Sequence, residues 1–335
     1  MSKIKMQIEP QHLKVSFIIP TLNESKTLHQ LLQSIQALDT YEGLSIEEVI
    51  VVDSGSEDGT PDIARSKNCT LITAKPGNVS NSRNIGAEQA RGDVLAFIDA
   101  DCELPNDWLL QVAKKLSDLD VLAAGACMTL NSSTDSWVEK TWYELAHKKQ
   151  GDGPCDEVNW LATFNLAVRK KAFDAIGGFD ATLATCEDVD FGYRLSKTGR
   201  LKKIYECGVL HHGESKRLGE FFRREAWRAR GSREVLKKNR SDLREIASYL
   251  LPIAVTMLAI LSVVFALALP LSDSYFPLIM AVFACLSAAF FGLITLLILK
   301  KDVSRPFILR SALLLSIYMF ARCYGSIRPF DRVER

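Results

Sequence analysis

The sequence predicts an α/β domain with a mostly parallel sheet, followed by membrane helices. Two observations predict this order: short apolar runs alternate with segments of helical spacing up to residue 116, and long uncharged stretches follow residue 245. Alternation of this kind is typical of βαβ units, in which helices cover both faces of the sheet. We therefore expect a globular domain of enzyme size and a membrane anchor.

The elements of the first part follow one another without repeats. We expect strands at residues 15–20, 48–53, 70–73 and 93–99, and helices at 24–38, 80–90 and 105–116. A further helix is expected after Thr60, because a threonine N-cap followed by Pro61 at the first helical position is a common helix start.

Polar residues directly follow three of the expected strands. They are Thr21-Leu22-Asn23-Glu24, Asp53-Ser54-Gly55-Ser56 and Asp99-Ala100-Asp101. Open α/β sheets bind ligands outside the carboxyl ends of their strands, so these segments predict one binding site. The chain has no GxGxxG after the first strand and no GxxxxGK[ST], which disfavours a dinucleotide-binding Rossmann domain and a P-loop NTPase.

Asp99 and Asp101 are the candidates for holding a metal. Carboxylates at positions i and i+2 of an extended segment point the same way, and together they can hold Mg²⁺ or Mn²⁺. The alternative is an ordinary turn in which both aspartates only bond the local backbone.

Six motifs together resemble the family 2 glycosyltransferases of the GT-A fold. They are SFIIPTLNE at 16–24, VVDSGSEDG at 51–59, SRNIG at 82–86, AFIDAD at 96–101, GGFD at 177–180 and EDVD at 187–190. The resemblance covers residues 14–230, in the order and spacing of the family. It implies the nucleotide-diphospho-sugar transferase fold, with a mostly parallel central sheet and helices on both faces.

The resemblance also implies roles for individual residues. The residues that would contact the nucleotide are Thr21, Asn23, Glu24, Asp53, Arg83, Asn84 and Asp99. Asp99 and Asp101 would hold the metal, with Asp101 the more direct ligand. Asp188 of the Glu187-Asp188 pair would be the catalytic base. Trp160 and Asn165 would lie on the acceptor side, although a tryptophan there is more often explained by core packing.

The acidic motif at 187–190 suits the chemistry of sugar transfer. A cation neutralises the leaving diphosphate, and a carboxylate on the opposite face deprotonates the acceptor hydroxyl. Burial and the neighbours Glu187 and Asp190 would raise the pKa of Asp188 toward neutrality. Acids that merely favour a helix N-terminus are the alternative, and it is compatible with the catalytic role.

His211 and His212 follow the apolar run 207–210. In GT-A enzymes a histidine after a late strand often completes the metal site, and imidazole suits Mn²⁺ beside carboxylates. Neighbouring residues of a strand face opposite sides, so only one of the pair can point inward, and we expect it to be His211. The alternative is a pair of loop histidines that only form hydrogen bonds.

The net charge of +1 conceals an uneven distribution. Residues 246–335 contain 8 basic and 4 acidic residues, so the first 245 contain 33 basic and 36 acidic ones. The near-neutral total argues against a nucleic-acid binder. Asp273 is the only charged residue between Glu245 and Lys300.

The uncharged stretches predict transmembrane helices. A span needs roughly 20 apolar residues, and we expect spans at 249–271, 276–299 and 307–327. The third contains Arg310 and Arg322, so a helix lying in the membrane interface is its alternative. The basic residues flank the first two spans on one side of the membrane, at positions 237, 238, 240 and 244 and at 300, 301 and 305. The positive-inside rule then places the N-terminal domain in the cytoplasm.

These patterns divide the chain into three regions. We expect a cytoplasmic GT-A catalytic domain at 1–215, a basic interfacial helix region at 216–245 and a membrane domain at 246–330 with two or three spans. No secretory signal begins the sequence, and the eight cysteines are expected to be reduced.

Residues 216–244 contain 11 basic and 4 acidic residues. This composition favours a helix on anionic lipid, with a solvated helix as the alternative. The stretch Arg223-Arg224-Glu225-Ala226-Trp227 does not match the Gln-x-x-Arg-Trp motif of the processive polysaccharide synthases in this family. Polymer synthesis is therefore disfavoured.

The function favoured by these observations is an inverting, metal-dependent glycosyltransferase. It would move a sugar from a nucleotide-diphosphate sugar, with UDP preferred over GDP or dTDP, to a lipid-linked or other membrane-associated acceptor. The setting would be bacterial surface or exopolysaccharide assembly at the inner membrane. Two alternatives stay open: a polyprenyl-phosphate sugar synthase, and a non-catalytic membrane scaffold that binds sugar nucleotide.

Overall fold

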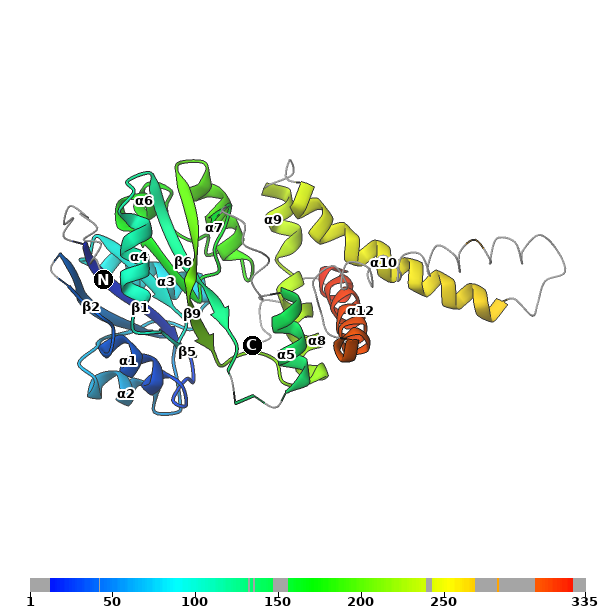
Figure 1. Cartoon of the computed structure of the whole chain (residues 1–335), viewed down its shortest axis with the longest axis horizontal. Coiled ribbons are helices and arrows are strands. Elements are labelled where there is room, and N and C mark those ends of the chain that lie inside the picture. Colours follow the sequence, from blue (N-terminus) through cyan, green and yellow to red (C-terminus); the bar gives the residue numbers. More distant parts are fainter. Residues whose placement is uncertain are drawn as a thin grey trace, which may run out of the picture. The chain divides into compact units, whose positions relative to one another are not determined.

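The computed structural model describes residues 13–41, 43–131, 133–134, 136–146, 156–238, 243–268, 282 and 305–327. The chain divides into two compact units. The first comprises Met1–Ser132 and Gly151–Gly213, and the second comprises Ser133–Gln150 and Glu214–Arg335. Figure 1 shows the elements of both units.

The first unit is built on one sheet of nine described strands. The strands are β1 (Leu13–Thr21), β2 (Leu44–Asp53), β3 (Thr70–Thr73), β4 (Val94–Ile98), β5 (Cys102–Glu103), β6 (Val121–Thr129), β7 (Glu157–Val158), β8 (Asn165–Arg169) and β9 (Arg200–His211). Their order is β3-β2-β1-β4-β8-β6-β9-β5, with β7 paired to β9. The site lies where β1, β2 and β4 end.

The prediction of a mostly parallel sheet is wrong in its second half. The pairs β1–β2, β1–β4, β2–β3 and β6–β9 are parallel. The pairs β4–β8, β6–β8, β5–β9 and β7–β9 are antiparallel, so the sheet is mixed. Antiparallel neighbours need no helical crossover, and so the alternation of strands and helices did not reveal them.

Each central strand contributes side chains to two cores. In β1, Phe17 and Ile19 join one buried cluster while Ile18 joins the other. In β4, Ile98 joins the cluster of Phe17, and Phe97 joins the cluster of Ile18. This alternation follows from the two-residue period of a strand, and it explains why both faces of the sheet need helices.

Helices cover both faces of the sheet, as predicted. The helices of the first unit are α1 (Leu28–Gln36), α2 (Thr60–Ser66), α3 (Val79–Gln89), α4 (Trp108–Leu116), α6 (Lys170–Ala175) and α7 (Glu187–Ser196). Buried residues of α1, α2 and α4 join the cluster of Phe17, and those of α3, α6 and α7 join the cluster of Ile18.

Helix α3 lies against the sheet at Gly86. A Cβ atom at this position would lie 2.5 Å from Cγ2 of Ile18, closer than real side chains approach. The glycine of the SRNIG motif therefore brings α3 close to β1, which sets the position of Arg83 one turn earlier.

The element boundaries differ from prediction by a few residues. The strand expected at 70–73 is β3 itself. Helix α2 begins one residue earlier than predicted, because Gly59 is its N-cap and Thr60 is already helical. The Thr60 hydroxyl instead accepts the backbone N–H of Glu24, which links α2 to the loop after β1.

The second unit is helical in its described residues. It contains α5 (Trp137–Ala146), α8 (Leu218–Ala229), α9 (Ser232–Lys238), α10 (Leu243–Ala268) and α12 (Arg305–Ile327). Its core is formed by Val138, Phe221 and Leu314 from three helices, and Trp142 packs edge-to-face on Phe221 with ring centroids 4.9 Å apart.

Helices α10 and α12 coincide with the first and third predicted spans. Within the part of the chain that the structure describes, however, neither these nor any other helix combines the length and the apolar character that a membrane crossing requires. The structure thus does not support those two predicted spans. The second predicted span, at 276–299, lies outside the described residues except for Val282.

Candidate active site

The ends of β1, β2 and β4 bring three predicted segments together. Thr21 and Asp53 are register partners in β1 and β2, and β4 pairs with β1 on its other side. The residues that follow these strands therefore share one edge of the sheet.

Asp53 holds the loop that follows β2. Its side chain is buried, and its carboxylate accepts hydrogen bonds from the Thr21 hydroxyl at 3.2 Å and from the backbone N–H groups of Gly55 and Ser56 at 3.1 and 3.0 Å. The Ser56 hydroxyl donates to the same carboxylate. Asp53 and Thr21 thus position this loop from within, and their contact with the nucleotide stays a prediction.

Asn23 and Glu24 form the loop after β1. Asn23 has a φ of 59°, a left-handed conformation that asparagine tolerates. Its N–H donates to the Ser56 hydroxyl at 2.8 Å, and its side-chain oxygen accepts the Glu57 N–H at 2.9 Å. These two hydrogen bonds join the loop after β1 to the loop after β2, and together the loops form one rim of the site.

Glu24 belongs to a group of neighbouring acids. Burial is the main reason that the pKa of Glu24 is raised, and the charges of Asp101, Asp99 and Asp58 add to the rise. The predicted metal carboxylates and Glu24 are therefore close enough to repel one another. A cation bound among them would relieve this repulsion.

Arg83 connects the two halves of the site. It is 2% exposed, and its Nη2 and Nη1 each donate at 2.7 Å, to Oδ1 of Asp99 and to Oε1 of Glu187 respectively. Burial disfavours the charged guanidinium, but Asp99 and Glu187 outweigh it and hold the pKa of Arg83 above its ordinary value. Asp99 and the acidic motif at 187–190 are thus joined by one buried cation.

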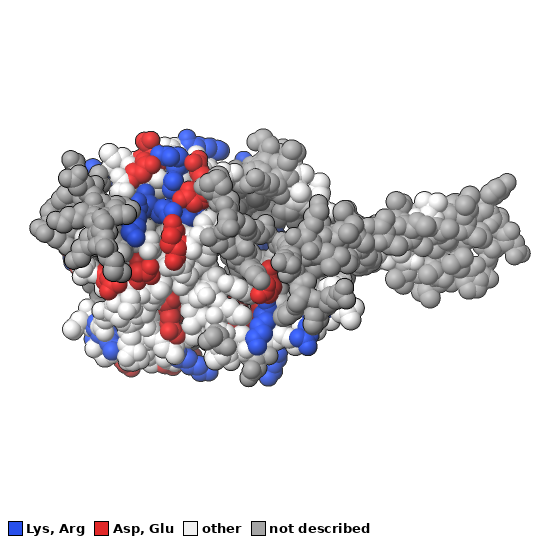
Figure 2. Space-filling model, in the orientation of Figure 1, with Lys and Arg blue, Asp and Glu red and all other residues white. Residues whose placement is uncertain are grey.

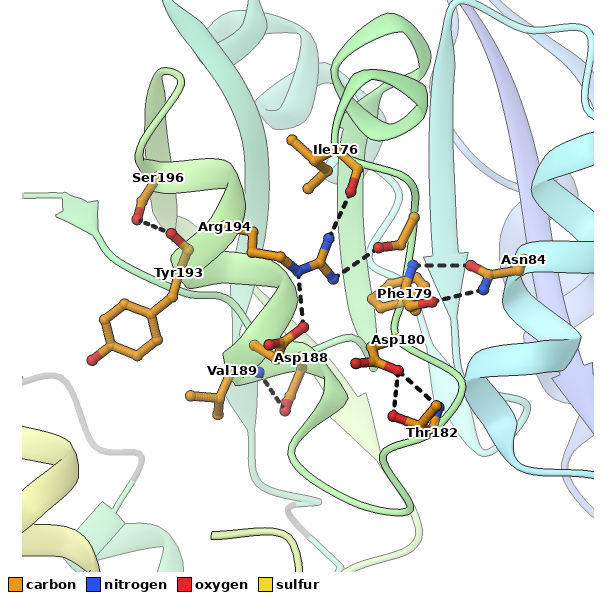
Figure 3. Close-up of polar contacts among 12 residues, drawn as sticks. Asn84, Ile176, Phe179, Asp180, Thr182, Asp188, Val189, Tyr193, Arg194 and Ser196 are labelled. Carbon is orange, nitrogen blue, oxygen red and sulfur yellow. Dashed lines mark hydrogen bonds and ion pairs between the residues drawn. The ribbon is translucent and has the colours of Figure 1, made fainter. Parts of the chain in front are cut away.

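Asn84 holds the GGFD loop. Its side-chain NH₂ donates to the Phe179 carbonyl at 2.8 Å, and its side-chain oxygen accepts the Phe179 N–H at 3.0 Å (Figure 3). Asn84 uses both groups of its amide to orient the loop beside the site, and its contact with the nucleotide stays a prediction. The Phe179 ring lies under the guanidinium of Arg83, 5.7 Å from its central carbon.

Helix α7 begins with the acidic motif. Its N-cap, Cys186, has a φ of 61°, a costly conformation for a residue other than glycine. Glu187 is buried against Arg83, and the side chain of Asp188 accepts the N–H of Val189 at 2.8 Å. Strained residues of this kind tend to occur where function requires one conformation.

Asp190 and Arg194 fix the same helix to the GGFD loop. Nε of Arg194 donates to Asp190 at 2.9 Å, and its two terminal nitrogens donate to the carbonyls of Ile176 and Gly178 at 2.9 and 2.8 Å (Figure 3). Arg194 was not among the residues predicted from the sequence. Its spacing of four residues from Asp190 on a helix was the signal that could have found it.

Asp101 and His211 form the candidate metal centre. Oδ1 of Asp101 lies 3.3 Å from Nε2 of His211, and the Cys102 sulfur lies with both inside a group whose candidate ligand atoms are all within 4.8 Å of one another. His212 instead pairs with Glu103 through its Nε2. Of the two histidines, the structure therefore places His211 beside Asp101.

The short strand β5 explains this arrangement. Cys102 pairs with His211 in the β5–β9 ladder, and the His212 N–H donates to the Asp101 carbonyl at 2.8 Å. Neither Cys102 nor Glu103 was singled out in the sequence, because only the pairing of β5 with β9 brings them to the site.

Asn165, which was predicted to lie on the acceptor side, is a buried residue of β8. The residue is 1% exposed, and its side-chain amide bonds both the N–H and the carbonyl of Ala126, at 2.6 and 3.1 Å. The indole N–H of Trp108 donates to it as well. Asn165 is a buried link between β8 and β6. Trp160, in contrast, is 41% exposed.

Known proteins resemble this chain in sequence. A model of the glycosyl transferase family 2 matches residues 16–177. Glycosyltransferase AglE of Haloferax volcanii is 27% identical over 250 residues, which cover 73% of this chain and 81% of AglE. The succinoglycan biosynthesis protein ExoA of Rhizobium meliloti is 26% identical over 261 residues, which cover 72% of this chain and 75% of ExoA. The match to the pre-mycofactocin glycosyltransferase of Mycobacterium tuberculosis, 25% identical, covers 65% of this chain but only 46% of that protein.

A solved structure resembles the chain in fold. The mannosyltransferase PcManGT from Pyrobaculum calidifontis, solved in complex with GDP-Man and Mn²⁺, has a TM-score of 0.64 to this structure at 19% sequence identity. The likeness covers 96% of this chain and 90% of that one. It confirms the GT-A-like α/β fold.

The family match and the named relatives decide between an enzyme and a binding scaffold. Both point to catalysis, and the acidic residues of the family motifs are intact and joined through Arg83. Residues 16–177 match the model of the glycosyl transferase family 2, and the protein is a glycosyltransferase of the hexosyltransferase type.

Proposed function

We propose that the enzyme transfers a sugar, with inversion, from a nucleotide-diphosphate sugar to a membrane-associated, lipid-linked acceptor, and that it depends on Mg²⁺ or Mn²⁺. One observation carries this proposal. The guanidinium of Arg83 joins Asp99, at the end of β4, to Glu187, in the first turn of α7. A donor diphosphate beside Asp99 and a base on α7 would then face one reaction centre.

The residues present fit a divalent cation. Asp101 offers a carboxylate oxygen and His211 an imidazole nitrogen 3.3 Å from it, a donor set suited to Mn²⁺. Cys102 is a poor match, because thiolates are soft ligands and this side chain is buried. Such a cation would act as a Lewis acid that neutralises the leaving diphosphate.

Asp188 is our assignment for the base. The EDVD motif at 187–190 resembles the family motif in which this aspartate is the base, and that resemblance supports the assignment. Asp188 would accept the proton of the acceptor hydroxyl while that oxygen attacks the anomeric carbon from the side opposite the leaving group. A single displacement of this kind inverts the configuration at that carbon.

The relatives support the proposed donor and setting. ExoA is named for succinoglycan biosynthesis, and PcManGT was solved with GDP-Man and Mn²⁺. We propose a nucleotide-sugar donor, UDP-linked in the first instance, and a role in surface-glycan or polysaccharide assembly. On the described surface in Figure 2, basic and acidic side chains are interspersed, which suits a small charged donor better than a nucleic acid.

We further propose that the enzyme acts at the cytoplasmic face of the inner membrane. The basic residues at 216–244 and the uncharged stretch 274–299 support membrane attachment. Large apolar side chains are also exposed on the helices of the second unit: Leu250, Met257, Leu309, Leu313 and Phe320. Extraction of cell membranes with alkaline carbonate, which strips peripheral proteins, tests the attachment.

A donor screen tests the proposed reaction. Membranes that contain the full chain would be incubated with UDP-, GDP- and dTDP-sugars and with Mg²⁺, Mn²⁺ or EDTA, while released nucleotide and lipid-extractable sugar are measured. We expect one donor class to be consumed, EDTA to stop the reaction, and Asp101→Asn membranes to be inactive. Failure of every donor with both cations would contradict the proposal. A product that is labile to mild acid would instead identify a polyprenyl-phosphate sugar synthase.

A further inference from the structure

The Glu103–His212 pair lies directly beside the candidate metal centre. Nε2 of His212 and Oε1 of Glu103 form a hydrogen bond, although the two residues are 109 positions apart in the sequence. The side chains of His212 and Glu103 are 23% and 37% exposed. Glu103 follows Asp101 by two positions, and His212 follows His211 directly. The contact therefore ties together the two segments that supply the candidate metal ligands.

Strand β9 is held firmly on the side of His211. It pairs with β6 in a long parallel ladder, in which Met128 and Thr129 are the register partners of Val209 and Leu210. His211 follows Leu210 and is still part of β9. The backbone of this candidate ligand is therefore placed by its pairing with β6, whatever the position of β5.

Strand β5 is held by fewer contacts. It has two residues and comes last in the strand order of the sheet, where it pairs with β9. Cys102 lies opposite His211 in this ladder, and the His212 N–H donates to the Asp101 carbonyl at 2.8 Å. Because so short a ladder makes few backbone hydrogen bonds, side-chain contacts across it contribute much to its position. The hydrogen bond between Glu103 and His212 is such a contact.

The separation of the candidate ligand atoms depends on how β5 lies along β9. Oδ1 of Asp101 is 3.3 Å from Nε2 of His211. Two neighbouring ligands of an octahedral ion, each about 2.1 Å from it, are about 3 Å apart. The two atoms thus have nearly the separation that a cation requires, and a shift of β5 would change it. Residues that hold metal ligands in place typically alter metal affinity by about 10- to 100-fold.

We propose that Glu103 and His212 are positioning residues, and that their hydrogen bond holds Asp101 and His211 at the separation a divalent cation requires. The inference rests on the metal dependence in the proposed function and extends it to two residues that act through the ligands. The alternative is an ordinary half-exposed pair, which would contribute little to stability and nothing to cation binding.

The test measures Mn²⁺ binding to the full chain without any donor, from the electron paramagnetic resonance signal of the free ion. We expect Glu103→Ala and His212→Ala each to raise the Kd for Mn²⁺ about tenfold. The double variant should bind about as well as either single variant, because both substitutions remove the same contact. Glu103→Gln can still form a hydrogen bond with the imidazole, so its Kd should stay within about threefold of the wild-type value.

Control variants separate this role from other effects. Asp118→Ala breaks a comparably exposed ion pair with Arg200, at the other end of β9, and should leave the Kd for Mn²⁺ unchanged. Asp101→Asn removes a candidate ligand and should weaken binding at least as much as Glu103→Ala does. Urea unfolding in EDTA should give similar midpoints for Glu103→Ala and the wild type, since the pair is half-exposed. With the donor found in the screen, Glu103→Ala should raise the KM for Mn²⁺ about tenfold and change kcat at saturating Mn²⁺ less than about twofold.

Each outcome decides the inference. A wild-type Kd for Mn²⁺ in Glu103→Ala and His212→Ala would overturn it, and so would effects that add in the double variant. Binding by Glu103→Gln as weak as that of Glu103→Ala would overturn it too, because the hydrogen bond would not be what matters. A wild-type chain that binds no Mn²⁺ would contradict both the inference and the proposed metal dependence. The expected Mn²⁺ affinities without turnover of any donor would refute the proposed transfer reaction and leave the role of the pair supported.

Discussion

Arg83 and Glu187 form a buried ion pair, with Nη1 of the guanidinium 2.7 Å from Oε1 of the carboxylate. The same guanidinium binds Asp99, so a residue of α3 joins the end of β4 to the start of α7. Three motifs that are far apart in the sequence depend on this one side chain. Its removal would leave two carboxylates facing each other without a counter-charge.

Replacement of Arg83 should therefore affect both folding and activity. We expect Arg83→Met to lower the free energy of unfolding by about 3 kcal/mol, because it breaks a buried pair on one side only. Sugar transfer should fall by at least about a hundredfold as the base-bearing turn loses its position. Arg83→Lys should retain part of the stability but little of the activity, since an ammonium cannot reproduce the two-pronged contact.

Arg91→Met is the matched control for this substitution. Arg91 also pairs with an acid, Glu48, but its side chain is 66% exposed. Urea unfolding of Arg91→Met should give a free energy of unfolding within about 0.5 kcal/mol of the wild-type value. Equal effects of the Arg83 and Arg91 substitutions on stability and transfer would contradict the role given to Arg83.

Asn165 should prove to be structural. We expect Asn165→Ala to lower the free energy of unfolding by about 3 kcal/mol, because Ala126 would retain a buried N–H and a buried carbonyl without partners. The acceptor KM of the folded fraction should be unchanged. Asn159→Ala, an exposed amide six residues earlier, serves as the control for urea unfolding. A raised acceptor KM with unchanged stability would restore the acceptor-side role.

The native thiols of Cys69 and Cys207 should be slow to react. Burial raises the pKa of Cys69 to about 11, and burial together with the charges of Asp107 and Glu206 raises the pKa of Cys207 to about 12. The thiolate is the reactive form, so at about pH 8 alkylation should be at least about a hundredfold slower than in the unfolded chain. Iodoacetamide labelling followed by peptide mass spectrometry measures both rates. Fast labelling of native Cys207 would contradict its position in the bulge of β9.

The ion pairs around Lys115 should make stability depend on pH. Asp156 and Glu206 are partly buried, which raises their pKa, but their bonds to Lys115 outweigh this and the pKa of each is lowered. A lowered pKa in the folded state gives stability that is present above the unfolded value, near pH 4, and is lost as the pH falls through the folded value.

Lys115→Met tests this dependence. We expect it to lower the free energy of unfolding by about 1 kcal/mol at neutral pH, and the difference from wild type should shrink as the acids become protonated below about pH 4. Urea unfolding of Lys115→Met and of the wild type, at neutral pH and below about pH 4, measures the difference in free energy of unfolding under each condition. Lys237→Met, which removes an exposed pair with Glu234, should show little change at either pH. A deficit that is equal at both pH values would indicate lost packing rather than lost charge pairing.

The sequence predicted the first half of the fold better than the second. Strands β1, β2 and β4 contain buried apolar runs, each followed by polar residues, and this local pattern is enough to identify them. Strand β8 has only five residues and joins the sheet antiparallel between β4 and β6, which no local pattern indicates.

The candidate site shows the same limit. Asp99, Asp101 and the acids at 187–190 are recognisable from motifs and strand ends. The roles of Asn84 and Asn165 are not, because each is defined by hydrogen bonds to backbone groups in other segments. A polar residue in a motif has the same appearance in the sequence whether it contacts a ligand or holds a loop.

The most direct test of the account is the rate of sugar transfer by Asp188→Asn with the donor identified in the screen. Asp174→Asn is the control, since it changes an exposed acid of α6 that pairs only with Lys170 among the ion pairs found. We predict that Asp188→Asn lowers transfer by about a thousandfold while donor binding stays within about threefold of wild type, because only the proton acceptor is lost. Asp174→Asn should transfer at the wild-type rate. Full transfer by Asp188→Asn would contradict the assignment of the base and, with it, the proposed mechanism.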